Sequence, residues 1–97
     1  MSSEIEQVEA VVRRYRERQP EETVEAFLFE GVFPLDFLTE KEEVRKAREP
    51  GYAVEIVDIP TGEPWIGVRE GEYVVRFPRL GLRNYQADAF EDGFEDA

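Results

Sequence analysis

Few side chains in this sequence can do chemistry. The 97 residues include no His and no Cys, so proton transfer would fall to Glu, Asp, Lys or Tyr, and a nucleophile would be Ser, Thr or a carboxylate. The only serines, Ser2 and Ser3, lie at an N-terminal end that we expect to be frayed, where no catalytic geometry is held. The sequence thus excludes Ser and Cys triads and the usual Cys/His zinc sites, and we predict that the protein is not an enzyme.

Carboxylates are the abundant reactive groups, with 23 Asp and Glu residues. Paired carboxylates catalyse glycoside hydrolysis, but so many acids form close pairs by chance. The stretch 88–93 has the start of a calcium-loop pattern, yet Phe90 stands at the third position, where an oxygen ligand is needed. We therefore predict no catalytic residue, no metal site and no cofactor.

Four basic residues lie close together in the middle of the chain: Lys41, Arg45, Lys46 and Arg48. We expect them on a helix that is followed by a hairpin, and this order of elements, over residues 4–77, resembles the winged-helix family. The resemblance rests on element order without a motif residue, and it implies nucleic-acid binding through these four side chains. Four acids share the same segment, so a solvated, charge-laced helix is the competing interpretation.

Three aromatic residues stand in an acidic C-terminal segment, residues 84–97: Tyr85, Phe90 and Phe94. This segment has five acids and no base. It is either a mobile, solvated tail or an amphipathic segment whose rings dock on its own domain or on another protein. The three rings are the candidate partner-binding residues.

Helical signals dominate the first half of the sequence. Between Glu4 and Arg18, apolar residues follow a helical spacing, and Pro20 is suited to the first turn of a second helix that ends near Gly31. Thr39 and Glu42 have the spacing of a capping box, which predicts a third helix. The three expected helices cover residues 4–18, 20–30 and 40–49, and the Phe-rich stretch 27–38 is the expected centre of the core.

After Gly51 the apolar residues alternate with a period of two, which predicts strands at 52–59, 65–69 and 72–77. Turn residues at 60–64 and 70–71 join them into a three-stranded antiparallel meander. The predicted fold class is α+β, with about three N-terminal helices packed on the three-stranded antiparallel β-meander and an acidic C-terminal tail. Residues 1–83 form a single domain and residues 84–97 the tail.

The formal net charge is −11, with ten Arg against two Lys. This composition resembles that of proteins from salt-loving archaea, and an acidic protein from a high-GC mesophile is the alternative. Such a charge makes nucleic acid an unlikely partner. No apolar run is long enough to span a membrane and the first residues lack a signal-peptide pattern, so we expect no membrane partner and a cytoplasmic location.

The aromatic surplus suggests how the protein works. The Phe-rich stretch exceeds what one small core holds, and the three rings after residue 84 add to the excess. We therefore expect a small, acidic, non-enzymatic protein-interaction or self-associating module, with another protein or a second copy as partner, as in a homodimer. The alternative is a winged-helix-like nucleic-acid-binding regulator.

Overall fold

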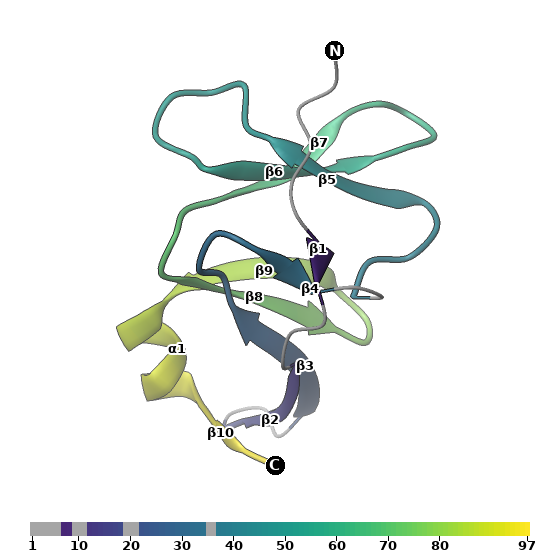
Figure 1. Ribbon diagram of the computed structural model, residues 1–97. Coiled ribbons are helices and arrows are strands. Elements are labelled where there is room, and N and C mark those ends of the chain that lie inside the picture. Colours follow the sequence, from purple (N-terminus) through teal and green to yellow (C-terminus); the bar gives the residue numbers. More distant parts are fainter. Residues whose placement is uncertain (1–6, 9–11, 19–21, 35–36) are drawn as a thin grey trace.

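The computed structural model describes residues 7–8, 12–18, 22–34 and 37–97 (Figure 1). Ser2, Ser3, Glu4 and Pro20, which entered the sequence predictions, lie outside these residues. The described part of the chain forms ten strands and one helix. They are β1 (Gln7–Val8), β2 (Arg13–Glu17), β3 (Glu22–Leu28), β4 (Phe33–Pro34), β5 (Glu42–Lys46), β6 (Val54–Asp58), β7 (Pro64–Val68), β8 (Glu72–Phe77), β9 (Gly81–Gln86), α1 (Ala87–Gly93) and β10 (Phe94–Asp96).

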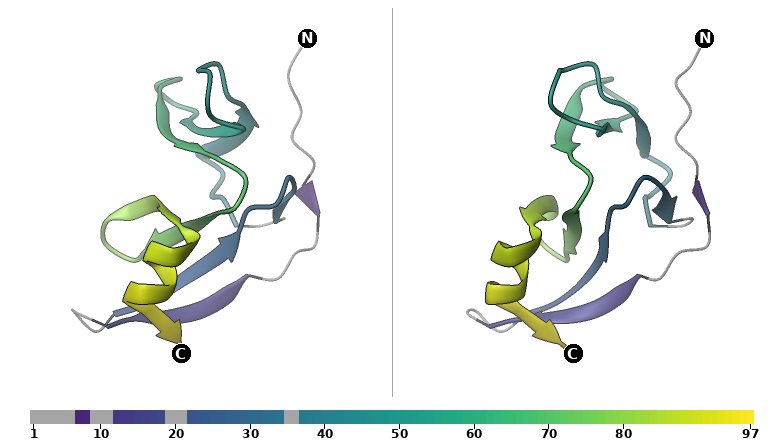
Figure 2. Two further views of the ribbon diagram at one scale, coloured as in Figure 1. Left: turned by 90° about the vertical axis from the view of Figure 1, so that its left-hand side faces the viewer. Right: turned by 60° about the vertical axis from the view of Figure 1, so that its left-hand side comes forward.

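These strands build two antiparallel sheets and one short parallel pair. The larger sheet has the order β10-β2-β3-β8-β9, the smaller has the order β5-β6-β7, and β1 pairs with β4. The smaller sheet lies at the top of Figure 1, above the larger one, and α1 lies beside the larger sheet (Figure 2). The fold is therefore mainly β, and the α+β prediction of helices on a meander is wrong.

The predicted first and second helices are replaced by β2 and β3. In β3 the residues alternate, with Val24 and Ala26 buried and Thr23 and Glu25 exposed, which is the period of a half-buried strand. β2 pairs with β3 on one side and with β10 on the other. This pairing makes β2 a strand although its Arg and Glu residues favour a helix, because helix propensity is a weak preference that tertiary contacts override.

The predicted third helix is replaced by a turn followed by β5. The Thr39 N–H donates to Glu42 Oε1 at 3.0 Å, as in a capping box, and the Glu42 N–H donates to Thr39 O at 3.0 Å. Arg69 and Glu72 make the same two bonds just before β8, at 2.8 and 3.2 Å. The local chemistry of a capping box therefore closes a turn that leads into a strand at both places.

The predicted meander is also wrong, although its three strands exist. β6 and β7 are paired, but β8 belongs to the other sheet, where it lies between β3 and β9. The chain passes from the smaller sheet to the larger one at Arg69–Gly71, where its backbone is hydrogen-bonded to Phe29, the residue after β3. The Phe29 N–H donates to Glu72 O at 2.9 Å, and the Gly71 N–H donates to Phe29 O at 2.8 Å.

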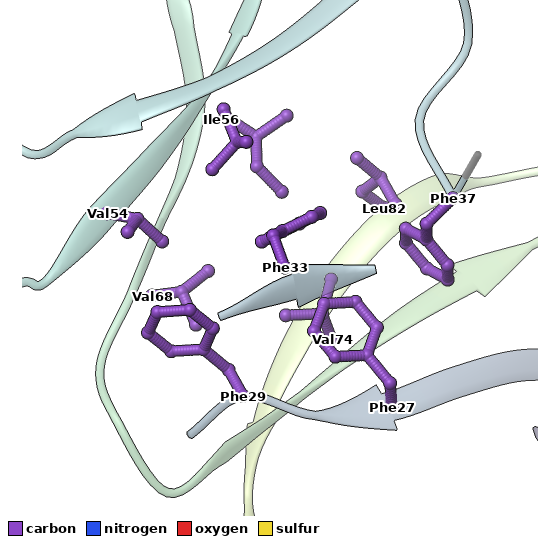
Figure 3. Close-up of a cluster of buried hydrophobic side chains, with 10 residues drawn as sticks. Phe27, Phe29, Phe33, Phe37, Val54, Ile56, Val68, Val74 and Leu82 are labelled. Carbon is purple, nitrogen blue, oxygen red and sulfur yellow. The ribbon is translucent and has the colours of Figure 1, made fainter. Parts of the chain in front are cut away.

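Each face of the larger sheet carries a cluster of buried side chains. One face packs against the smaller sheet, and we call the side chains between them the intersheet core (Figure 3). Its buried members are Phe27, Phe29, Phe33, Phe37, Val44, Val54, Ile56, Val68, Val74 and Leu82. The other face carries a second cluster beneath α1, which we call the aromatic layer. Its buried members are Val24, Ala26, Val75, Phe77, Phe90 and Phe94, with Tyr15, Tyr73 and Tyr85 packed around them.

An ion pair joins the two sheets at the edge of the intersheet core. Arg76 of β8 donates through Nη2 to Glu42 Oε1 of β5 at 2.5 Å and to Phe37 O at 3.3 Å. Burial acts to raise the pKa of Glu42, but the hydrogen bonds from Arg76 and from the Thr39 N–H outweigh it, so the pKa is lowered. Glu42 is therefore an ionised group that fixes the smaller sheet to the larger one.

Candidate functional site

The most distinctive surface feature is a groove on the smaller sheet, centred on Trp65 of β7. Its volume is about 450 Å³. Trp65 has 51% of its surface exposed and Tyr52 has 37%, which is a high exposure for two large aromatic side chains in a small protein. We call this feature the Trp65 groove. Its lining residues are Ala47, Arg48, Glu49, Tyr52, Glu55, Pro64, Trp65, Ile66 and Gly67.

A close approach to Gly67 holds the ring of Tyr52 in place. A Cβ atom at position 67 would lie 2.8 Å from Tyr52 Cδ1, so only glycine allows the ring to rest on the β7 backbone. On the other side, the Arg69 guanidinium carbon lies 4.6 Å from the ring centroid, and Arg69 Nε donates to Gly51 O at 2.8 Å. Tyr52 is thus a fixed wall of the groove, and Trp65 is its exposed neighbour.

The floor of the groove contains a buried carboxylate, Glu55 of β6. Its Oε2 accepts hydrogen bonds from Arg45 Nε at 2.9 Å and Arg48 Nε at 3.1 Å. Burial acts to raise the pKa of Glu55, but the hydrogen bond from Arg45 and the charge of Arg48 outweigh it, so the pKa is lowered. Glu55 is therefore held ionised and is a poor proton donor, and its role in the groove is to fix the two arginines.

The four predicted basic residues do not form one binding surface. Lys41 is exposed in the turn before β5 and Lys46 is exposed at its end, whereas Arg45 and Arg48 share the single carboxylate of Glu55. The helix that was expected to present them is a strand. The element order on which the winged-helix resemblance rested is therefore absent from the described residues.

The three predicted partner-binding rings are brought together, but inside the molecule. Phe90 is 2% exposed and Phe94 is 5% exposed. The Phe90 and Phe94 rings are stacked at 4.5 Å, and Tyr85 meets Phe94 at 5.4 Å. Burial raises the pKa of Tyr85, because it disfavours the phenolate. The rings thus dock on their own domain in the aromatic layer, which is one of the alternatives that the sequence left open, and their role in binding a partner stays a prediction.

The Trp65 groove is distinguished by its exposed aromatic side chains. Among the described residues, no three acidic side chains come together closely enough to hold a metal ion. A second hollow of similar size lies beside β3, between Arg13, Leu28 and Glu30. One large apolar side chain in the lining of this hollow, Leu28, is more than one third exposed. The Trp65 groove has two such side chains, Tyr52 and Trp65, and both are aromatic. Tyr and Trp are the residue types that dominate binding energy at protein interfaces.

Sequence reasoning assigned Trp65 and Tyr52 to strands and missed the groove. One signal was present: the single Trp of the chain lies in a strand whose alternation places it on the face opposite to the apolar residues Ile66 and Val68. The pairing of Glu55 with Arg45 and Arg48 depends on the register of β5 against β6, which sequence spacing does not reveal.

No family model matches the chain, and no curated protein or solved structure is significantly similar to it. Among the described residues, no helix is long and apolar enough to cross a membrane.

Proposed function

We propose that this chain is a non-enzymatic protein-interaction module that binds an extended, basic segment of a partner protein in the Trp65 groove. The observation that carries the proposal is the half-exposed Trp65 beside a Tyr52 ring that Gly67 and Arg69 hold in position. A wall that is already ordered loses little side-chain entropy on binding, which favours affinity.

Charge supports a basic partner segment. The chain has a net charge of −11, and Glu49 and Glu63 are exposed at or beside the groove. The free face of an exposed Trp attracts cations, with Arg and Lys as the usual donors. The carboxylate within the groove, Glu55, is neutralised by Arg45 and Arg48, so apolar contact with Trp65 is not opposed by an unpaired buried charge.

The test is a selection of random displayed peptides on the purified full chain, followed by titration of the selected peptides. Trp65 is the single Trp, so its emission reports binding at the groove directly. We expect peptides with one or more Arg or Lys next to apolar residues. Trp65→Ala has no Trp left to report, so its affinity is compared with that of the wild type by the fluorescence anisotropy of a labelled peptide. The substitution should weaken binding by about 30-fold, because an interface Trp commonly contributes 2 kcal/mol or more.

Leu80→Ala is the matched control, since Leu80 is 63% exposed and is not among the lining residues of the groove. It should leave peptide affinity unchanged, and replacing the basic residues of the peptide by Glu should abolish binding. Selected peptides that bind Trp65→Ala and the wild type equally well would refute the proposal.

A further inference from the structure

The open edge of the smaller sheet has a charge pattern that is complementary to itself. In the order β5-β6-β7, β5 lies at an edge, and no other described strand pairs with its free side. Its sequence is Glu-Glu-Val-Arg-Lys, so two acids precede Val44 and two bases follow it. An antiparallel copy of this strand, centred on Val44, places each acid opposite a base.

The backbone of β5 is set for such pairing. The Ala47 N–H donates to Ala53 O at 3.2 Å and the Ile59 N–H donates to Lys41 O at 2.8 Å, so the odd-numbered residues from 41 to 47 direct their backbone groups toward β6. Antiparallel strands alternate in this respect. The N–H and C=O of Val44 and Lys46 therefore point to the open side, and so does the C=O of Glu42, whereas the Glu42 N–H is already bonded to Thr39 O. A second copy can thus form four ladder hydrogen bonds, two between the Val44 residues and two from Lys46 N–H to Glu42 O.

We propose that two copies of this chain associate through β5, antiparallel about a two-fold axis at Val44, joining two three-stranded sheets into one of six strands. Val44 then faces Val44 of the second copy, Glu42 faces Lys46, and Glu43 faces Arg45. The self-complementary surface is the isologous type on which two-fold dimers are built. This interface is separate from the Trp65 groove, and it stands or falls independently of the proposed peptide binding.

The pairing extends ion pairs that already exist in one copy. Arg45 is bound to Glu55 through Nε at 2.9 Å, and it lies on the same face of β5 as Glu43, because side chains alternate along a strand. Glu42 is bound to Arg76, and Lys46 is exposed at the end of β5. Across the axis, Lys46 therefore adds a positive charge to the Glu42 carboxylate that Arg76 already holds. Glu43 likewise adds a negative charge to the Arg45 guanidinium that Glu55 already holds.

Two other sheet edges, β7 and β10, do not offer the same match. On β7, the Gly67 carbonyl accepts a hydrogen bond from Asn84 Nδ2 of β9 at 3.1 Å, so β9 covers that edge. β10 is three residues long and contains Glu95 and Asp96, which would repel a second copy. Charged residues on an edge strand usually keep molecules apart, but the signs along β5 repel a parallel neighbour and attract an antiparallel one.

The experiment is sedimentation velocity of the purified full chain over a range of concentrations, at about 0.1 M and about 1 M KCl. The Debye length falls from ~10 Å to ~3 Å between these conditions, so the repulsion between two chains of net charge −11 is screened. We expect a monomer–dimer equilibrium that shifts toward the dimer at the higher salt concentration.

Two pairs of variants test the register. Lys46→Glu places Glu opposite Glu42, and Glu43→Lys places Lys opposite Arg45, twice in each dimer because of the symmetry. Each variant therefore replaces two opposite-charge pairs by two like-charge pairs, which should raise the dissociation constant by about tenfold. The matched controls, Lys41→Glu and Glu40→Lys, make the same charge changes at exposed residues outside the paired segment and should leave the dissociation constant within about twofold.

A second measurement does not depend on variants. Amide hydrogen exchange of Val44 and Lys46 in the wild-type chain should slow as the protein concentration rises, because these N–H groups gain carbonyl acceptors only in the dimer. A wild-type chain that stays monomeric at both salt concentrations overturns the proposal. So does a dimer in which Lys41→Glu acts as strongly as Lys46→Glu, or in which exchange at Val44 is independent of concentration.

Discussion

The two faces of the larger sheet are covered in different ways. The intersheet core joins residues from β3 to β9, and its phenylalanines meet edge to face, with Phe27 and Phe33 at 4.8 Å and Phe27 and Phe37 at 4.9 Å. The aromatic layer is closed by the last residues of the chain. It combines edge-to-face pairs with two stacked pairs, Tyr73–Phe90 at 4.1 Å and Phe90–Phe94 at 4.5 Å. One cluster ties the two sheets together, whereas the other covers the outer face with α1.

This difference separates the parts of the molecule that position the candidate sites from the part that closes the fold. The Trp65 groove and the β5 edge both lie on the smaller sheet, which the intersheet core and the Arg76–Glu42 ion pair attach to the rest. The aromatic layer contacts neither of them. A perturbation of the intersheet core should therefore affect the sites, and a perturbation of the aromatic layer should affect stability alone.

The largest effect is expected for Phe33→Ala. Phe33 is fully buried and its ring contacts Phe27, Phe29 and Phe37. The truncation should lower the free energy of unfolding by about 3–5 kcal/mol, which is a large share of the 5–15 kcal/mol typical of a domain. Urea denaturation followed by Trp65 fluorescence measures this loss, with Leu80→Ala as the exposed control. A loss below about 1 kcal/mol would show that the intersheet core is not the main attachment.

Phe90→Ala should cost somewhat less, about 3 kcal/mol, because α1 is a single short helix that can settle into part of the cavity. Its distinctive result lies in the native state. The emission maximum of Trp65 should stay at its wild-type value, since the aromatic layer does not reach the groove. A shifted Trp65 emission in folded Phe90→Ala protein would contradict the separation of the two clusters.

The buried carboxylates should make stability depend on pH. The pKa values of Glu42 and Glu55 are lowered in the folded chain, where arginine contacts outweigh burial. Their stabilising contribution is therefore complete above the unfolded pKa of about 4.3 and is lost as the pH falls through the lowered folded values. Urea denaturation should give constant stability from neutral pH down to about pH 5 and a decline below it.

Glu55→Gln tests which carboxylate is responsible. It should lower stability at neutral pH by about 1–3 kcal/mol, because Arg45 and Arg48 lose a charged acceptor, and it should reduce the decline at acid pH. Glu40→Gln, at an exposed position in the turn before β5, is the matched control and should change stability by less than about 0.5 kcal/mol. An equal effect of both substitutions would mean that the buried network contributes nothing specific.

The sequence predicts the local features of this chain better than their assembly. The three strands predicted after Gly51 exist as β6, β7 and β8, although β6 is buried on both faces rather than alternating, and the Thr39–Glu42 hydrogen bond forms as the capping-box spacing indicates. Whether a helix or a strand followed each turn depended on backbone pairing with segments that are distant in the sequence. β2 has Tyr15 as its one apolar residue, and its strand form rests on pairing with β3 and β10, which no local spacing encodes. The groove was missed for the same reason, since Tyr52 and Gly67 meet across a sheet.

The smallest stability effect, and the sharpest distinction between structural and binding residues, is expected for Trp65→Ala. Trp65 is 51% exposed and belongs to neither buried cluster, so the substitution should change the free energy of unfolding by less than about 1 kcal/mol. Far-UV circular dichroism during urea denaturation measures this, because the variant has no Trp left to report by fluorescence. Truncating a side chain that fills a core lowers the free energy of unfolding strongly, whereas truncating an exposed side chain that serves binding changes it little. A loss of about 3 kcal/mol or more would place Trp65 among the residues that hold the smaller sheet together and would remove the main support for the groove as a binding site.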